Sequence, residues 1–125
     1  MFLLAGGMLF VGLMPASAQT RVKALPPSFI GLWAWDQESC AKPDDDGQVT
    51  IKPRSVDFYA SGYSLQVISN RPDGTFHATA LVSEEGESAK TRGTIALKLV
   101  ASGRLLIKAG APEGHIYVHC GAARP

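Results

Sequence analysis

The sequence predicts an all-β protein: an eight-stranded antiparallel up-and-down meander that forms a small barrel or half-barrel with one disulfide. Three observations support this fold class. Apolar and polar residues alternate with a period of two through most of the chain beyond residue 29. Short turns rich in Gly, Pro, Asn and Asp separate the alternating runs, and one cysteine lies near each end of the region. No segment shows the 3.6-residue period of an amphipathic helix.

The first 18 residues have the pattern of a secretory signal peptide. An apolar run over residues 2–13 precedes Pro15 and the small-residue triplet Ala16-Ser17-Ala18, so we expect cleavage after Ala18. The run is shorter than the roughly 20 residues that span a bilayer as a helix. The mature protein is therefore expected in the periplasm or the medium, without stable membrane insertion.

Residues 19–28 are expected to form an extended lead-in, because Pro26 and Pro27 are stiff and do not continue a helix. Residues 29–125 are expected to form a single barrel domain. The expected strands are 29–35, 48–53, 55–60, 63–69, 74–84, 92–101, 103–109 and 114–120. The turns between them are short, which makes neighbouring strands antiparallel.

Alternation assigns one side of each strand to the interior. The residues expected to face inward are Val49, Ile51, Val56, Phe58, Leu65, Val67, Phe76, Ala78, Ala80, Val82, Ile95, Leu97, Leu99, Leu105, Ile107, Ile116 and Val118. On the same reading, His115, Tyr117 and His119 face outward. The inward set is large enough to fill an eight-stranded interior with side chains, which disfavours a roomy ligand cup.

Strand parity predicts where the charges lie. In an up-and-down meander the first, third and fifth connections share one end of the sheet, and the even connections share the other. The residues expected at the first of these ends are Asp36, Glu38, Asp44, Asp45, Asp46, Ser61, Gly62, Glu84, Glu85 and Glu87. Arg54, Arg71 and Arg104 are expected at the opposite end. A protein with a formal net charge of +1 is thus predicted to be dipolar.

Cys40 and Cys120 form an even pair in a chain that is expected to be exported, and such a pair is typical of a disulfide. The alternative is two buried free thiols. A bridge would close a loop of about 80 residues, which on the chain-entropy model stabilises the fold by roughly 4.5 kcal/mol.

Several function classes find little support in the residues. The balanced charge does not favour nucleic-acid binding. Asp44, Asp45 and Asp46 lack the alternate spacing and terminal glutamate of a calcium loop, and are better explained as a solvated turn. His115 and His119 lie about 13 Å apart along a strand, too far for one metal ion. No nucleophile elbow or other catalytic frame occurs, so no enzyme activity, metal or cofactor is expected.

Two resemblances to known families bear on the fold and its role. Gly31-Leu32-Trp33 resembles the Gly-x-Trp that opens lipocalins, in which Trp33 would plug one end of a barrel. Tyr59-Ala60-Ser61-Gly62-Tyr63 is similar to the Ser-Gly-Ala-Arg-Tyr loop of the exported c-type lysozyme inhibitors, which are eight-stranded barrels with a disulfide. Here Ser61 and Gly62 match, while the alanine and arginine before the tyrosine are missing.

The resemblance to lysozyme inhibitors implies a binding loop at Ser61, Gly62 and Tyr63, and a second, lysine-containing loop at Lys90. Together with the predicted acidic end, the candidate partner-binding residues are Ser61, Gly62, Tyr63, Asp44, Asp45, Asp46, Glu84, Glu85 and Lys90. The first functional hypothesis is an exported, non-enzymatic binding protein that inhibits a cationic protein such as a c-type lysozyme. The alternative is an envelope barrel with a structural or small-ligand-binding role.

Overall fold

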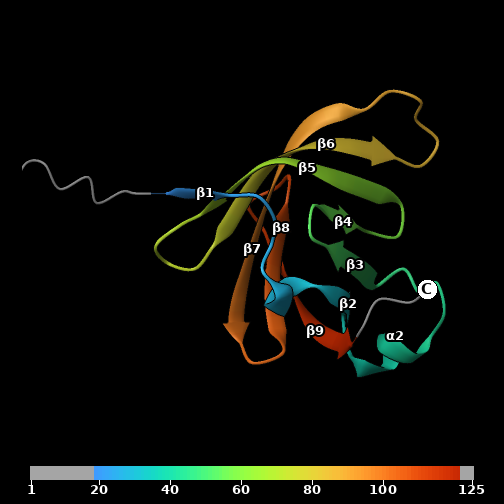
Figure 1. The fold of residues 1–125 in the computed structure, drawn as a ribbon. Coiled ribbons are helices and arrows are strands. Elements are labelled where there is room, and N and C mark those ends of the chain that lie inside the picture. Colours follow the sequence, from blue (N-terminus) through green and yellow to red (C-terminus); the bar gives the residue numbers. More distant parts are fainter. Residues whose placement is uncertain (1–18, 122–125) are drawn as a thin grey trace, which may run out of the picture.

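The computed structural model describes residues 19–121, and within them the fold is all-β (Figure 1). It consists of a nine-stranded antiparallel sheet, one short α-helix and one 3₁₀ turn. The strands are β1 (Thr20–Val22), β2 (Gly31–Ala34), β3 (Gln48–Lys52), β4 (Ser55–Asp57), β5 (Ser61–Asn70), β6 (Phe76–Glu84), β7 (Thr91–Ala101), β8 (Arg104–Ala109) and β9 (His115–Gly121). The helical elements are η1 (Pro27–Phe29) and α2 (Gln37–Ala41). The predicted signal peptide lies outside the described residues.

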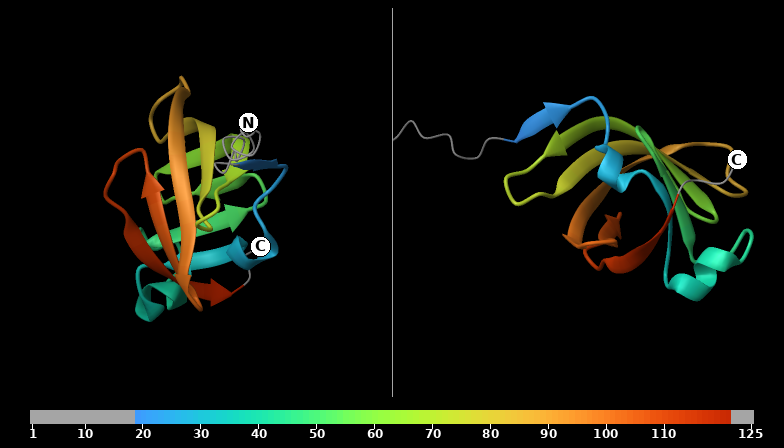
Figure 2. Two further views of the ribbon diagram at one scale, coloured as in Figure 1. Left: turned by 90° about the vertical axis from the view of Figure 1, so that its left-hand side faces the viewer. Right: turned by 60° about the horizontal axis from the view of Figure 1, so that its bottom comes forward.

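Strands β2 to β9 follow one another around a closed eight-stranded barrel. Of the two architectures that the sequence left open, the structure is therefore the barrel and not the half-barrel. Each strand pairs antiparallel with the next along the chain, and β9 pairs with β2 to complete the ring. Figure 2 shows the strands curling around a common axis. The eight-stranded up-and-down fold predicted from the sequence is confirmed.

A ninth strand, β1, comes from the segment expected to be only an extended lead-in. It pairs with the last part of β5, from Val22 opposite Ile68 to Thr20 opposite Asn70. The short strand β4 pairs with the first part of the same edge of β5. Together β1 and β4 cover the edge of a long strand that a single short neighbour would leave exposed, and exposed edges invite pairing with other chains.

Arg54 joins these two short strands at the seam between them. Its guanidinium donates hydrogen bonds to the carbonyl oxygens of Leu65 and Gln66 on β5, at 2.9 and 2.8 Å, and to the carbonyl oxygen of Lys23 beyond β1. The ladder between β5 and β6 shifts register between Leu65 and Val67. The arginine thus satisfies backbone acceptors where the regular ladder is interrupted.

The barrel interior is filled by side chains. Most of the residues predicted to face inward are buried in one continuous cluster, including Ile51, Leu97 and Leu105. The predictions for Val67, Ile116 and Val118 are wrong. Val67 and Ile116 are exposed, at 39% and 42%, and Val118 is half-buried on the outer side.

Two local features explain these errors. The register shift in β5 inserts an extra residue, so the interior position after Leu65 goes to Ile68 rather than to Val67. In β9, Tyr117 pairs with the inward-facing Leu105 and is itself buried. Apolar character alone had assigned the two faces of β9, but the pairing turns the tyrosine inward.

One end of the barrel is closed by the lead-in. Leu25 and Phe29 are buried there, and the Phe29 ring meets Phe76 edge-on with ring centroids 5.1 Å apart. The buried indole N–H of Trp33 donates a hydrogen bond of 2.9 Å to the carbonyl oxygen of Phe29. His119 contacts the other side of the tryptophan, with ring centroids 4.6 Å apart. Trp33 therefore closes the barrel at the end where β2 begins.

The helix α2 lies in the connection from β2 to β3, where only a loop was expected. Asp36 caps it, because its carboxylate accepts a hydrogen bond of 2.8 Å from the backbone N–H of Ser39. This hydrogen bond lowers the pKa of Asp36 below its usual value. The helix contacts β2 and β9, and the outward-facing Leu32 and Ala34 of β2 are buried.

A disulfide joins Cys40 of α2 to Cys120 of β9, with Cα atoms 5.5 Å apart. The prediction of a bridge between the connection after the first barrel strand and the last strand is confirmed. A disulfide is compatible with an oxidising, exported compartment. Among residues 19–121, no helix is long and apolar enough to cross a bilayer.

Candidate partner-binding end of the barrel

The up-and-down order places alternate connections at opposite ends of the barrel. The β2–β3, β4–β5, β6–β7 and β8–β9 connections share one end, which we call the acidic end, and the other three share the opposite end. In Figure 1, α2, the β4–β5 loop and the β6–β7 loop all lie at the right of the molecule. The lead-in closes the opposite end, so the acidic end is the open mouth.

Charge is strongly divided between the two ends. Within the described residues, Asp73 is the single acidic residue at the opposite end. The acidic end carries the others, which are Asp36, Glu38, Asp44, Asp45, Asp46, Asp57, Glu84, Glu85, Glu87 and Glu113. Arg54, Arg71 and Arg104 lie at the turns of the opposite end, as strand parity predicts. The acidic end therefore attracts cations over a distance set by ionic strength.

Four of the predicted site residues meet in one shallow depression, which we call the loop hollow. Its lining comprises Asp57, Phe58, Tyr59, Ala60, Ser61, Gly62, Ser83, Glu84 and Glu85, and it encloses about 340 Å³. The backbone N–H of Glu85 donates a hydrogen bond of 2.9 Å to the carbonyl oxygen of Ala60. This bond holds the β4–β5 and β6–β7 loops side by side, so that Ser61 and Gly62 lie next to two carboxylates.

A second depression lies in the barrel opening, and we call it the mouth hollow. It is lined by Phe58, Ile107, Ala109, Ala111, Glu113, His115 and Tyr117 and encloses about 280 Å³. Ile107 is buried, while Glu113 and His115 are exposed. The hollow therefore has apolar and aromatic walls and an ionisable rim.

Phe58 lines both hollows, so they form one continuous surface. Its ring meets the Tyr63 ring edge-on, with centroids 5.6 Å apart. Tyr63 pairs with the inward-facing Val56 and Val82, and so faces the interior instead of standing on the loop with Ser61. Burial raises the pKa of Tyr63 above its usual value, and the Glu84 carboxylate raises it further.

Trp35 contacts Tyr117, one of the residues that line the mouth hollow. Burial raises the pKa of Tyr117, and a side-chain hydrogen bond with Trp35 partly opposes that effect. The Trp35 ring lies against Gly47, where a methyl group on the glycine would come within 2.6 Å of the ring. The tryptophan remains 52% exposed. It therefore offers a flat aromatic surface beside the mouth.

The other predicted site residues lie at the acidic end but outside both hollows. Asp44, Asp45 and Asp46 form the turn between α2 and β3, where the Asp45 carboxylate accepts a hydrogen bond of 3.0 Å from the backbone N–H of Gly47. Lys90 lies at the far side of the β6–β7 loop, just before β7. The structure thus brings together Ser61, Gly62, Glu84 and Glu85, whereas Asp44, Asp45, Asp46 and Lys90 share only the same end of the barrel.

Sequence reasoning missed the aromatic part of this surface. Tyr59 is 62% exposed in the loop hollow, and Tyr117 and Phe58 line the mouth. One signal was available: each of the three tyrosines of the chain lies in a connection of the acidic end or at the third position of the strand that follows one. Tyrosine and tryptophan are enriched at protein interfaces.

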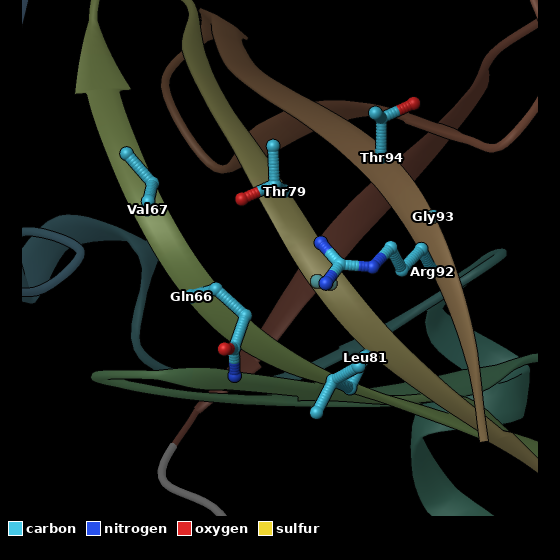
Figure 3. A pocket seen from close by; sticks show the side chains of 8 residues that line it. Gln66, Val67, Thr79, Leu81, Arg92, Gly93 and Thr94 are labelled. Atoms are coloured by element: carbon cyan, nitrogen blue, oxygen red, sulfur yellow. The ribbon is translucent and has the colours of Figure 1, made fainter.

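A larger groove lies away from this end, on the outer wall of β5, β6 and β7 (Figure 3). Its lining includes Gln66, Val67, Thr79, Leu81 and Arg92 and it encloses about 500 Å³. It follows the bulge in β5 and carries no concentrated charge. Over residues 19–121, no cluster of three or more His, Cys, Asp or Glu side chains is arranged to hold a metal ion.

Comparison of the chain with known proteins found no family model, curated protein or solved structure that matches it. The fold and the geometry of the acidic end therefore define the class: a closed eight-stranded up-and-down barrel with one disulfide and one open, acidic, aromatic-lined end.

Proposed function

We propose that the protein is an exported binding protein of the periplasm or medium that docks its acidic end on a basic protein and inhibits it, a c-type lysozyme being the specific candidate. One observation carries the proposal: two adjoining hollows lined by aromatic side chains, among which Tyr59 is 62% exposed, lie at the end of the barrel that holds nearly all the carboxylates of the chain. Aromatic side chains supply contact area, and complementary charge supplies orientation and association rate.

The loop hollow is the part of this surface that matches the resemblance to lysozyme inhibitors. Ser61 and Gly62 line it together with the exposed Tyr59. A methyl group on Gly62 would come within 3.1 Å of the Asp57 carboxylate, so the glycine keeps this part of the hollow open.

The test is the lysis of cell walls by lysozyme, followed by turbidity, with an excess of the mature protein at low and at high salt. We expect slowed lysis at low salt and weaker inhibition at high salt, because screening acts on exposed charges. Lysozyme with acetylated lysines is the matched control for the partner's charge. Full lysis at excess protein and low salt would exclude the inhibitor function and leave the structural or small-ligand role as the better hypothesis.

A further inference from the structure

We infer that the mouth hollow is a receptor for a single cationic side chain, with arginine favoured over lysine, presented by the basic partner. This inference rests on the proposed function for the partner, but it concerns the mouth hollow and not the loop hollow that the family resemblance indicates. It adds a second, chemically distinct element of recognition, in which the partner's side chain enters this protein.

The size of the hollow limits what it accepts. Its volume of about 280 Å³ lies just below the range of roughly 300–1,000 Å³ typical of pockets for drug-sized ligands. The floor is the buried Ile107, below which the interior is packed with apolar side chains. The hollow is therefore a shallow socket, suited to one long side chain and too small for a large ligand.

The walls and rim match the two parts of an arginine side chain. The half-buried Phe58 and Ala109 offer an apolar and aromatic surface to its aliphatic stem, and the nearly buried Tyr117 adds a small part of its ring. The face of an aromatic ring attracts a guanidinium group, and the planar guanidinium stacks on such rings better than an ammonium does. The exposed Glu113 supplies an opposite charge at the rim. Glu113 and the carboxylates of the adjoining loop hollow disfavour an anionic side chain at the same place.

The socket is held in shape from both sides. Trp35 contacts Tyr117 on one side, and Phe58 is held by the edge-on ring of Tyr63. The β8–β9 loop forms a third wall, and the backbone N–H of Gly110 anchors it with a hydrogen bond of 3.0 Å to the carbonyl oxygen of Thr94. A preformed site loses less conformational entropy when it binds.

The direct test uses the mature protein and two small probes, N-acetyl-arginine amide and N-acetyl-citrulline amide. Both ends of each probe are blocked, so that only the side chain can carry a charge. Citrulline has nearly the same shape as arginine but no charge. We expect the arginine probe to shift the NMR signals of Ala109, Ala111 and Tyr117 in a saturable way, and to bind at least fivefold more tightly than the citrulline probe. Equal shifts by the two probes, or shifts confined to other parts of the barrel, would overturn the inference.

Matched variants separate the socket from the general charge of the acidic end. Glu113→Gln should weaken arginine binding at least threefold, whereas Glu87→Gln, at the same end but outside the hollow, should change it less than twofold. Ala111→Phe should fill the socket and abolish the shifts, with Ala101→Phe at the opposite end as its control. Equal weakening by Glu113→Gln and Glu87→Gln would show a diffuse electrostatic effect and contradict a defined socket.

The same variants keep this inference distinct from the proposed function. If Ala111→Phe still inhibits lysozyme like the parent protein, the socket is not used by that partner and the inference fails while the function stands. If lysozyme is not bound at all but the arginine probe shifts the mouth signals, the socket stands and the choice of partner is wrong. Circular dichroism of each variant confirms that it is folded before either comparison.

Discussion

The indole N–H of Trp33 donates a hydrogen bond of 2.9 Å to the carbonyl oxygen of Phe29, inside the closed end of the barrel. This contact joins the lead-in to the first barrel strand, and both residues are almost completely buried. It makes one end of the barrel a sealed, apolar base and leaves the acidic end as the open one. The Trp33–Phe29 contact therefore contributes to the difference between the closed end and the open end of the barrel.

Trp33→Phe should therefore lower the free energy of unfolding by about 2 to 4 kcal/mol, because it leaves the Phe29 carbonyl oxygen unpaired and a cavity beside it. Urea unfolding followed by circular dichroism measures the change. The control is Tyr59→Phe, whose ring is 62% exposed and should make a difference of less than about 1 kcal/mol. Equal effects of the two substitutions would contradict the sealing role of Trp33.

Arg54→Met should loosen β1 before it unfolds the barrel. The substitution removes the donors for the carbonyl oxygens of Lys23, Leu65 and Gln66, and we expect a loss of about 1 to 3 kcal/mol. Native-state hydrogen exchange should show faster exchange at Val22 and Leu25 than in the parent protein, with the amides of β7 little changed. Arg104→Met, also at the opposite end, is the control. Unchanged exchange at Val22 would refute the role of Arg54 at the seam.

Replacing Cys40 and Cys120 by serine should cost several kcal/mol, since a closed loop of 80 residues restricts the unfolded chain by roughly 4.5 kcal/mol on the chain-entropy model. The serine pair should melt at a clearly lower temperature than the parent protein, and reductant should lower the melting temperature of the parent toward that of the variant. If reductant leaves the melting temperature of the parent protein unchanged, this prediction is wrong.

The protein should lose stability in alkali through Tyr63 and Tyr117. Burial raises the pKa of both groups above the usual value of about 10, so the folded state holds their protons more tightly than the unfolded state. The resulting stabilisation is complete below about pH 10 and is lost as the pH rises through the raised pKa values. Titration by absorbance at 295 nm, with unfolding measured at each pH, should show this loss. The Tyr63→Phe and Tyr117→Phe variants should each reduce it.

Neutralising Asp45 and Glu85 together should slow association with a cationic partner and leave stability nearly unchanged. Exposed loop charges contribute to association rate far more than to folding. Asp45→Asn keeps the oxygen that accepts from the Gly47 N–H, so the turn is preserved. Stopped-flow association with lysozyme at two ionic strengths measures the rate, and Asp73→Asn at the opposite end is the control. Equal slowing by the control would argue against docking at the acidic end.

Much of this architecture is encoded locally. The period of two in the apolar residues, broken by short turns, determines strands, antiparallel neighbours and, through strand parity, the charge of each end. The cysteine pair follows from the same order, since the first and last barrel strands become neighbours when the sheet closes. These features depend on backbone geometry and on the removal of apolar area from water, which act on every strand alike.

Tertiary structure decided the features that depend on pairing between distant segments. Because of the register shift beside Leu65, Ile68 and not Val67 occupies the interior. The pairing with Leu105 turns Tyr117 inward, although its neighbours Ile116 and Val118 are more apolar. The same closure placed Phe58 between the two hollows. Alternation gives two faces to a strand but does not say which face the ring of strands will enclose, because that choice depends on hydrogen-bond register across the whole barrel.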